Sequence, residues 1–230
     1  MEIAEKSTVS FDTDQNPLLD RFLSEVSGRV TDLGAGLGRH TGYMLERGFD
    51  VHAVDRVLTP EIRSIASRYG GRCRLTEADI TNPGFPAGSV DAIWSSHCLE
   101  HTLDPLSVLG EWRRVLKPDG VLCVIVPPFK TQVVGRHVFT GWTVGQLMLT
   151  LLRAGFDIRG GAFARHWYNV CAIVRPLSNP PRFEPNDEIL CRHHALFPPQ
   201  IEREILASRR LNPFGETISC FEGDIQRINW

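Results

Sequence analysis

Residues 32–38 read Asp-Leu-Gly-Ala-Gly-Leu-Gly, and they join a short apolar segment, Arg29 to Leu33, to a helix-like segment that runs through Glu46. Glycine lets a chain turn sharply and lets a ligand approach the backbone, and the helix that follows directs its first amide N–H groups at that ligand. The stretch therefore predicts a strand, a glycine turn that holds a ligand, and a helix.

Elements of the same kinds alternate on both sides of this turn. An amphipathic helix is predicted before it, at Pro17 to Val26. After it come further strands (Asp50 to Val54, Cys73 to Ala78, Val90 to Ser95, Val121 to Val126) and helices (Pro60 to Tyr69, Leu103 to Leu116, Thr143 to Ala154), with a turn at Lys117 to Gly120. The alternation predicts an α/β fold with a Rossmann-like, doubly wound sheet of seven strands, mostly parallel and flanked by helices.

The end of the sheet is expected to differ from that of a dinucleotide dehydrogenase. Phe156 to Ala164 and Trp167 to Val174 have no helix between them, so they should form an antiparallel C-terminal hairpin at the sheet edge. Residues 1–175 are then one cofactor-binding domain. Residues 176–230, which are rich in proline, are predicted to be an appendage with one helix at Gln200 to Ser208, packing on the domain or on a partner subunit, with a homodimer as one possibility.

Composition restricts the class of protein. The 230 residues are 42% hydrophobic and carry a formal net charge of −2, so we expect a substantial core and no nucleic-acid partner. No apolar run is long enough to span a membrane and no signal peptide is evident, which favours a cytoplasmic enzyme. The six cysteines form no C-x-x-C pair and are expected to be reduced structural thiols.

Asp55 is the second polar feature that points to a nucleoside ligand. It ends the next predicted strand, about 20 residues after the glycine turn, where a carboxylate accepts hydrogen bonds from ribose hydroxyls in dinucleotide-binding folds. The NAD fingerprint G-x-G-x-x-G would require glycine where this chain has Arg39, whereas Gly34, Gly36 and Gly38 form G-x-G-x-G. An NAD-dependent dehydrogenase is therefore a weaker alternative.

Four segments resemble the class I S-adenosylmethionine-dependent methyltransferases, within a region from about Val30 to Arg175. They are Asp32 to Gly38, Ala78-Asp79-Ile80, Leu99-Glu100-His101 and Glu111 to Gly120. The resemblance implies a methyltransferase with S-adenosylmethionine as its cofactor, which becomes S-adenosylhomocysteine. The implied cofactor-binding residues are Asp32, Gly34, Ala35, Gly36, Gly38, Asp55, Arg56, Asp79, Ile80, Ser95 and Ser96.

Histidines near the predicted carboxyl ends of strands are candidates for a catalytic base, since a hydroxyl acceptor must lose a proton. The candidates are His97, His101 and His137. On a helix, His97, Glu100 and His101 would share a face and could hold a divalent metal, although no metal is expected. The same string matches the inverted zincin motif H-x-x-E-H, but its place after a parallel strand disfavours a metallopeptidase.

The acceptor is suggested by two segments, Val126 to Lys130 and Thr140 to Leu147, which look like methyltransferases encoded with bacterial surface-polysaccharide genes. That resemblance implies O-methylation of a sugar hydroxyl in polysaccharide biosynthesis, with Trp142, Arg165 and His166 contacting the acceptor. Two alternatives remain: O-methylation of a small natural product or quinone-like phenol, and a non-catalytic subunit that binds the cofactor.

Overall fold

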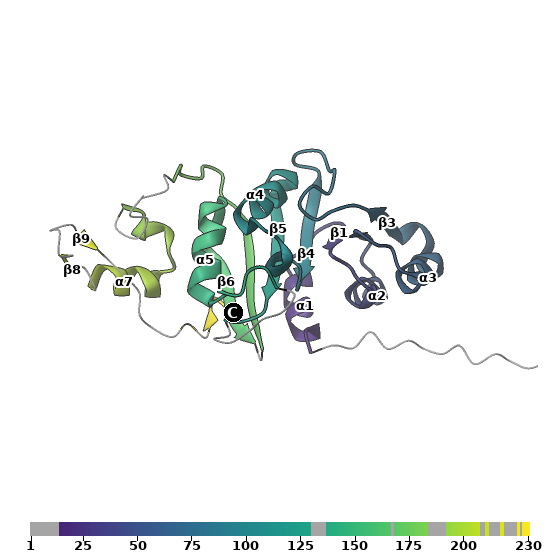
Figure 1. Cartoon of the computed structure of the whole chain (residues 1–230), viewed down its shortest axis with the longest axis horizontal. Helices are drawn as coiled ribbons and strands as arrows, with labels where there is room; N and C mark the ends of the chain where they lie inside the picture. The colour runs from purple at the N-terminus through teal and green to yellow at the C-terminus, as the bar shows by residue number, and fades with distance from the viewer. Residues whose placement is uncertain are drawn as a thin grey trace, which may run out of the picture.

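The protein forms an eight-stranded sheet with helices on both faces (Figure 1). The computed structural model describes residues 14–129, 137–166, 168–183, 192–207, 210–211, 217–218, 225 and 227–230. The strand order is β10-β6-β7-β5-β4-β1-β2-β3, and a separate small sheet pairs β8 with β9. Figure 1 shows the chain extending from α2 and α3 at one end of the sheet to α5 and α7 at the other.

The parallel part of the sheet follows the predicted alternation. It contains β1 (Val30–Leu33), β2 (Val51–Asp55), β3 (Cys73–Glu77), β4 (Val90–Ser96) and β5 (Leu116–Val126). After β1, the chain adds β2 and β3 on one side, and then crosses to place β4 on the other side. The carboxyl ends of β1 and β4 therefore border the crevice where open α/β sheets bind ligands.

The antiparallel end of the sheet is also as predicted, with one addition. β6 (Phe156–His166) and β7 (Asn169–Pro176) form the hairpin, and β7 pairs with β5. β10 (Arg227–Ile228) adds an eighth strand, antiparallel to β6, where seven were predicted. A two-residue strand is too short to show a period in the sequence, which explains why it was missed.

Apolar side chains of the strands divide between two cores. On one face, α1 (Asn16–Leu23), α2 (Arg39–Glu46) and α3 (Pro60–Tyr69) cover residues such as Val30 and Val51. On the other face, α4 (Pro105–Val115), α5 (Val144–Arg153) and α7 (Pro199–Ala207) cover residues such as Leu33 and Leu122. Because β5 is covered on both sides, Val121–Val126 is buried throughout, which explains its unbroken apolar run.

The predicted turn at Lys117 to Gly120 is wrong. These residues belong to β5, which begins at Leu116 beside Val90, and the β4–β5 register shifts between Val90 and Ala92. Lys117 pairs with Asp91 across this irregularity. In that register Lys117 to Gly120 have no partner residues in β4, so the Pro-Asp-Gly sequence forms a bulge within β5 and does not end the strand.

Several segments of residues 176–230 pack on the same core as α4 and α5. Phe197, Ile201, Ile205 and Ile228 are buried there. Arg159 of β6 reinforces the contact, since its Nη1 lies 2.8 Å from Glu202 Oε2. The domain boundary at residue 175 remains a prediction.

The sequence predicted no membrane-spanning segment and reduced cysteines. None of the helices there combines the length and the apolar character needed to cross a bilayer. Cys73, Cys98, Cys123 and Cys171 are free thiols, while Cys191 and Cys220 lie outside the described residues.

Candidate active site

The glycine turn leaves an open space beside its middle residue. Gly34, Gly36 and Gly38 all have positive φ angles, of 82°, 55° and 79°, a conformation that other residues rarely adopt. A Cβ atom on Gly34 would collide with Cys98 Sγ, and one on Gly38 would press on Ile62 and Ile65 of α3. Nothing lies within 4 Å of the corresponding position on Gly36, so its backbone faces free space.

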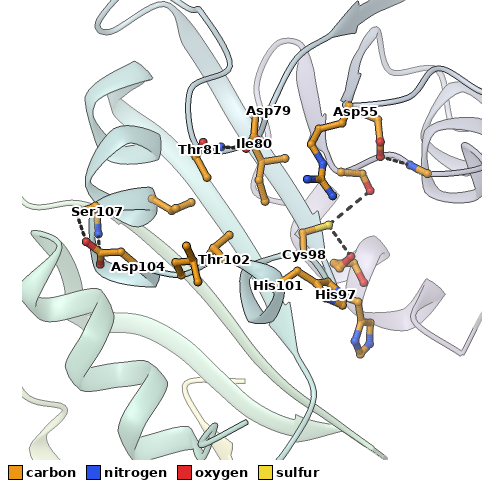
Figure 2. A pocket seen from close by; sticks show the side chains of 16 residues that line it. Asp55, Asp79, Ile80, Thr81, His97, Cys98, His101, Thr102, Asp104 and Ser107 are labelled. Atoms are coloured by element: carbon orange, nitrogen blue, oxygen red, sulfur yellow. Dashed lines mark hydrogen bonds between the residues drawn. The ribbon is translucent and has the colours of Figure 1, made fainter. Parts of the chain in front are cut away.

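That space is a cavity of about 740 Å³ at the carboxyl ends of β1 to β4 (Figure 2). Figure 2 shows Asp55, Asp79 and Ile80 on one side and His97, Cys98 and His101 across from them. The cavity is lined by Gly34, Gly36, Asp55, Arg56, Asp79, Ile80, Thr81, Ser96, His97, Cys98, His101, Thr102, Leu103, Asp104, Ser107 and Val108. Its size suits a ligand as large as a nucleoside derivative.

Two carboxylates fix the loops on the first side of the cavity. Asp55 Oδ2 accepts a hydrogen bond of 2.8 Å from the Gly36 amide, which ties the end of β2 to the glycine turn. Asp79 Oδ1 accepts one of 2.9 Å from the Thr81 amide, and this bond holds the pKa of Asp79 below its usual value. Asp79 is therefore an anion at neutral pH.

The loop after β3 is also held from beneath. Trp112 of α4 is fully buried, and its Nε1 donates a hydrogen bond of 2.8 Å to the carbonyl oxygen of Ile80. Trp112 belongs to the segment Glu111 to Gly120, which resembles the methyltransferases, but its sequence context indicated no role for it. Its indole fixes the backbone beside Asp79, so that Ile80 presents its side chain to the cavity.

Four residues predicted to bind the cofactor do not line the cavity. Asp32 is 2% exposed and Ser95 is 1% exposed; Ser95 Oγ donates to the Leu33 carbonyl at 2.9 Å. Ala35 and Gly38 shape the turn, with a 2.8 Å bond from the Gly38 amide to the Ala35 carbonyl. These residues lie behind the cavity wall and support the turn, and their direct contact with the cofactor stays a prediction.

Asp32 is a buried acid with one strong hydrogen-bond partner. Thr41 Oγ1 donates to Asp32 Oδ2 at 2.6 Å. Burial nevertheless dominates and raises the pKa of Asp32 from 3.8 to about 7, because a carboxylate loses its hydration inside the protein. Its stabilising contribution is therefore complete below about pH 4, falls as the pH rises, and is lost above about pH 7.

We expect Asp32→Asn to remove this pH dependence, because an amide stays neutral. The free energy of unfolding, measured in urea at pH 5 and pH 8, should change less with pH in the variant than in the original protein. Compared with the original protein, the variant should therefore be relatively more stable at pH 8 than at pH 5. An equal difference between the two proteins at both pH values would contradict the assignment.

His97 lies at the end of β4 and is held on several sides. Its φ angle is 55°, and its amide donates to the Ile125 carbonyl at 2.9 Å. Nδ1 lies 3.2 Å from Glu100 Oε1, and Nε2 lies 2.9 Å from Asn169 Oδ1. Burial by itself lowers the pKa of His97, but the hydrogen bonds and the charge of Glu100 outweigh it, so that the pKa is raised.

Two residues of the hairpin, Tyr168 and Asn169, contact His97. Asn169 begins β7 and is buried, and the Tyr168 ring stacks on His97 with 6.3 Å between ring centroids. Arg165 and His166, predicted to contact the acceptor, end β6 and are not among the cavity-lining residues. A buried amide at the start of an otherwise apolar strand was the available signal for Asn169.

The predicted helical face of His97, Glu100 and His101 does not form. His97 precedes a short 3₁₀ helix, η2 (Leu99–His101), so the three residues do not share one helical surface. The residues that come together are Glu100, His101 and His137, whose potential ligand atoms lie within 4.8 Å of one another. His137, on the segment before α5, replaces His97 in the set.

Trp142 lies in the core. Its side chain is 1% exposed and its ring packs against Phe139, with 4.6 Å between centroids. An acceptor sugar cannot stack on a ring whose faces are covered, so the prediction of a sugar-stacking role is corrected.

Part of the chain is similar to a known protein family. Residues 31–124 match a family model described as a methyltransferase domain. Over this stretch the chain is similar to a methyltransferase domain. The match spans the glycine turn, both carboxylates and His97, that is, both sides of the cavity.

Relatives of the methyltransferase domain cover part of the chain. An uncharacterised methyltransferase of Mycobacterium bovis is 33% identical over 107 residues, which are 46% of this chain and 43% of the relative. A ubiquinone biosynthesis O-methyltransferase of Actinobacillus pleuropneumoniae is 32% identical over 121 residues, covering 46% of this chain and 51% of the relative. The chain thus spans about half the length of these relatives.

A solved structure shows the same fold. The 1,6-didemethyltoxoflavin-N1-methyltransferase of Burkholderia thailandensis, which was crystallised with S-adenosylhomocysteine, has a TM-score of 0.60 and 23% identity, covering 75% of this chain and 80% of its own. At this identity the likeness concerns the arrangement of helices and strands.

Proposed function

We propose that the protein binds S-adenosylmethionine in the cavity and transfers its methyl group to a hydroxyl of a small acceptor. The observation that carries the proposal is the meeting of an open glycine backbone at Gly36 with two carboxylate-bearing strand ends, Asp55 and Asp79, in one cavity. The methyltransferase family match over the same residues supports it.

The cofactor's nucleoside belongs on the Asp55 side. Each Asp55 oxygen has one backbone donor, so lone pairs remain to accept hydrogen bonds from the ribose hydroxyls. Asp79, Ile80 and Thr81 form the wall for the adenine. The methionine part then lies along Gly34 and Gly36, and the sulfonium methyl points to the side of the cavity that His97 lines.

His97 is the proposed base. The acceptor oxygen attacks the methyl carbon as the carbon–sulfur bond breaks, S-adenosylhomocysteine leaves, and the hydroxyl proton passes to an imidazole nitrogen of His97. Nε2 can take it in the neutral form of His97, after Nε2 has released its own proton to solvent and the acceptor hydroxyl has replaced Asn169 there, while Glu100 stays at Nδ1 and fixes the ring. The protein otherwise contributes alignment, which is the main requirement of an in-line displacement.

For the acceptor we favour a phenol-like molecule over a saccharide. Leu103 is 90% exposed on the cavity wall, and Val108 lies on that wall as well, so the acceptor side offers apolar surface. The likeness to a ubiquinone biosynthesis O-methyltransferase agrees with this choice. The sequence predicted a sugar acceptor that stacks on Trp142, but this side chain is buried. A saccharide therefore remains the second acceptor class.

Calorimetric titration with S-adenosylhomocysteine tests the cofactor, and an acceptor screen then tests the reaction. We expect micromolar binding of S-adenosylhomocysteine, followed by methylation of catechols or quinols in one arm or of nucleotide sugars and glycans in the other. Binding of NAD in place of S-adenosylhomocysteine would overturn the proposal. Cofactor binding without transfer in either arm would favour a non-catalytic subunit.

A further inference from the structure

We propose that Glu100, His101 and His137 bind a divalent first-row transition-metal cation such as Zn²⁺ or Co²⁺. This goes beyond the proposed function, because methyl transfer from a sulfonium to oxygen requires no metal. It also departs from the sequence analysis, which expected no metal and named a different set of candidate ligands.

The Glu100 carboxylate is the first reason. Its side chain is 0% exposed, and within the described part of the chain Oε2 has no hydrogen-bond partner. A carboxylate oxygen buried without a donor is costly, and such oxygens usually bind a cation or a hydrogen-bond donor. The other oxygen, Oε1, faces His97 Nδ1 at 3.2 Å.

The two histidines supply the remaining ligands. The rings of His101 and His137 lie edge to face, with 5.1 Å between centroids and an interplanar angle of 77°. One nitrogen from each lies within 4.8 Å of a Glu100 oxygen and of the other ring. Ligand atoms about 2 Å from a shared Zn²⁺ are closer together than this limit, and small side-chain rotations can close the difference.

The backbone holds these ligands near one another. The carbonyl oxygen of Glu100 accepts hydrogen bonds from the amides of Val138 and Phe139, at 2.9 and 3.0 Å. The residue that supplies the carboxylate therefore also anchors the segment that begins at His137. Glu100 and His137 are far apart in the sequence, and these backbone hydrogen bonds keep their segments together.

The donor set selects the class of cation. Two imidazoles and one carboxylate suit borderline transition metals, whereas Mg²⁺ and Ca²⁺ prefer oxygen ligands throughout. His97, through Nδ1, fits the outer-shell partner that commonly orients a ligating carboxylate. Three protein ligands leave coordination positions for water or for another oxygen.

Titration of the full chain with Co²⁺, followed by visible absorption, tests the site. We expect one equivalent to give the d–d bands of nitrogen and oxygen ligation, without a thiolate charge-transfer band. His137→Ala and Glu100→Gln should each weaken Co²⁺ binding by roughly 100-fold or more. Loss of a residue that only supports a metal ligand already lowers metal affinity by about 10–100-fold. Zn²⁺ should displace Co²⁺ and abolish the bands.

His194→Ala is the matched control, because His194 also faces a carboxylate, Glu202 Oε1 at 3.0 Å, but lies on another element, η3 (His194–Leu196). It should bind Co²⁺ as the original protein does. No stoichiometric binding, a thiolate band, or equal affinity in His137→Ala would overturn the proposal. Circular dichroism checks folding of Glu100→Gln, and S-adenosylhomocysteine titration without metal tests the cofactor site separately.

Discussion

Asp55→Ala should weaken S-adenosylhomocysteine binding by at least about 100-fold. The ribose would lose a charged acceptor for its hydroxyls, and a hydrogen bond to a charged group contributes about 1.5–3 kcal/mol. The Gly36 amide would lose its 2.8 Å partner as well, so the glycine turn would be less well fixed for the ligand. Calorimetric titration of both proteins measures the loss directly.

Asp50→Ala provides the control for this experiment. Asp50 precedes β2 at its amino end and pairs there with Arg29 and Arg72, at 3.4 and 3.5 Å, away from the cavity. It should bind S-adenosylhomocysteine with the original affinity. If Asp55→Ala also did so, the ribose would have to lie elsewhere and the proposed orientation of the cofactor would be wrong.

His97→Ala should lower kcat by about 10²–10⁴-fold, the usual contribution of a positioned base, while S-adenosylhomocysteine affinity stays within about threefold. The prediction depends on His97 facing the cavity with its ring fixed by Glu100 and Asn169. Initial rates with the acceptor found in the screen give kcat, and calorimetry gives the cofactor affinity.

Two outcomes of that experiment would contradict a base. An unchanged kcat would exclude His97 from the proton transfer. Equal losses in kcat and cofactor affinity would indicate a structural role, since the ring also supports the end of β4. His194→Ala, distant in the fold, should leave both quantities unchanged.

Much of the fold was predictable because its signals are local. The glycine turn, the apolar segments and their order determine the sheet, and Asp55 and Asp79 follow strands whose ends can be identified in the sequence. The prediction was wrong at Lys117 to Gly120, which belong to β5 as a bulge without partner residues in β4.

The candidate site was less predictable because burial and distant contacts determine it. Asp32 lies one residue before the end of β1 and Asp55 ends β2, yet Asp32 is buried and Asp55 lines the cavity, a difference that their spacing in the sequence does not indicate. Asn169 contacts His97 across 72 residues of sequence. His137 lies near Glu100 because the amides of the next two residues, Val138 and Phe139, donate to the Glu100 carbonyl. Trp142 is a residue type that often binds sugars, but its indole is buried in the core.

The cavity's two sides come from different strands, and this has a consequence for evolution. The residues assigned to the cofactor lie at the ends of β1, β2 and β3, whereas the apolar residues Leu103 and Val108 follow β4. Mutations of the apolar residues on the acceptor side can change which acceptor binds without changing the residues that hold the cofactor. In the proposed function, substitutions at Leu103 and Val108 can therefore change the acceptor, while selection on cofactor binding acts on other positions.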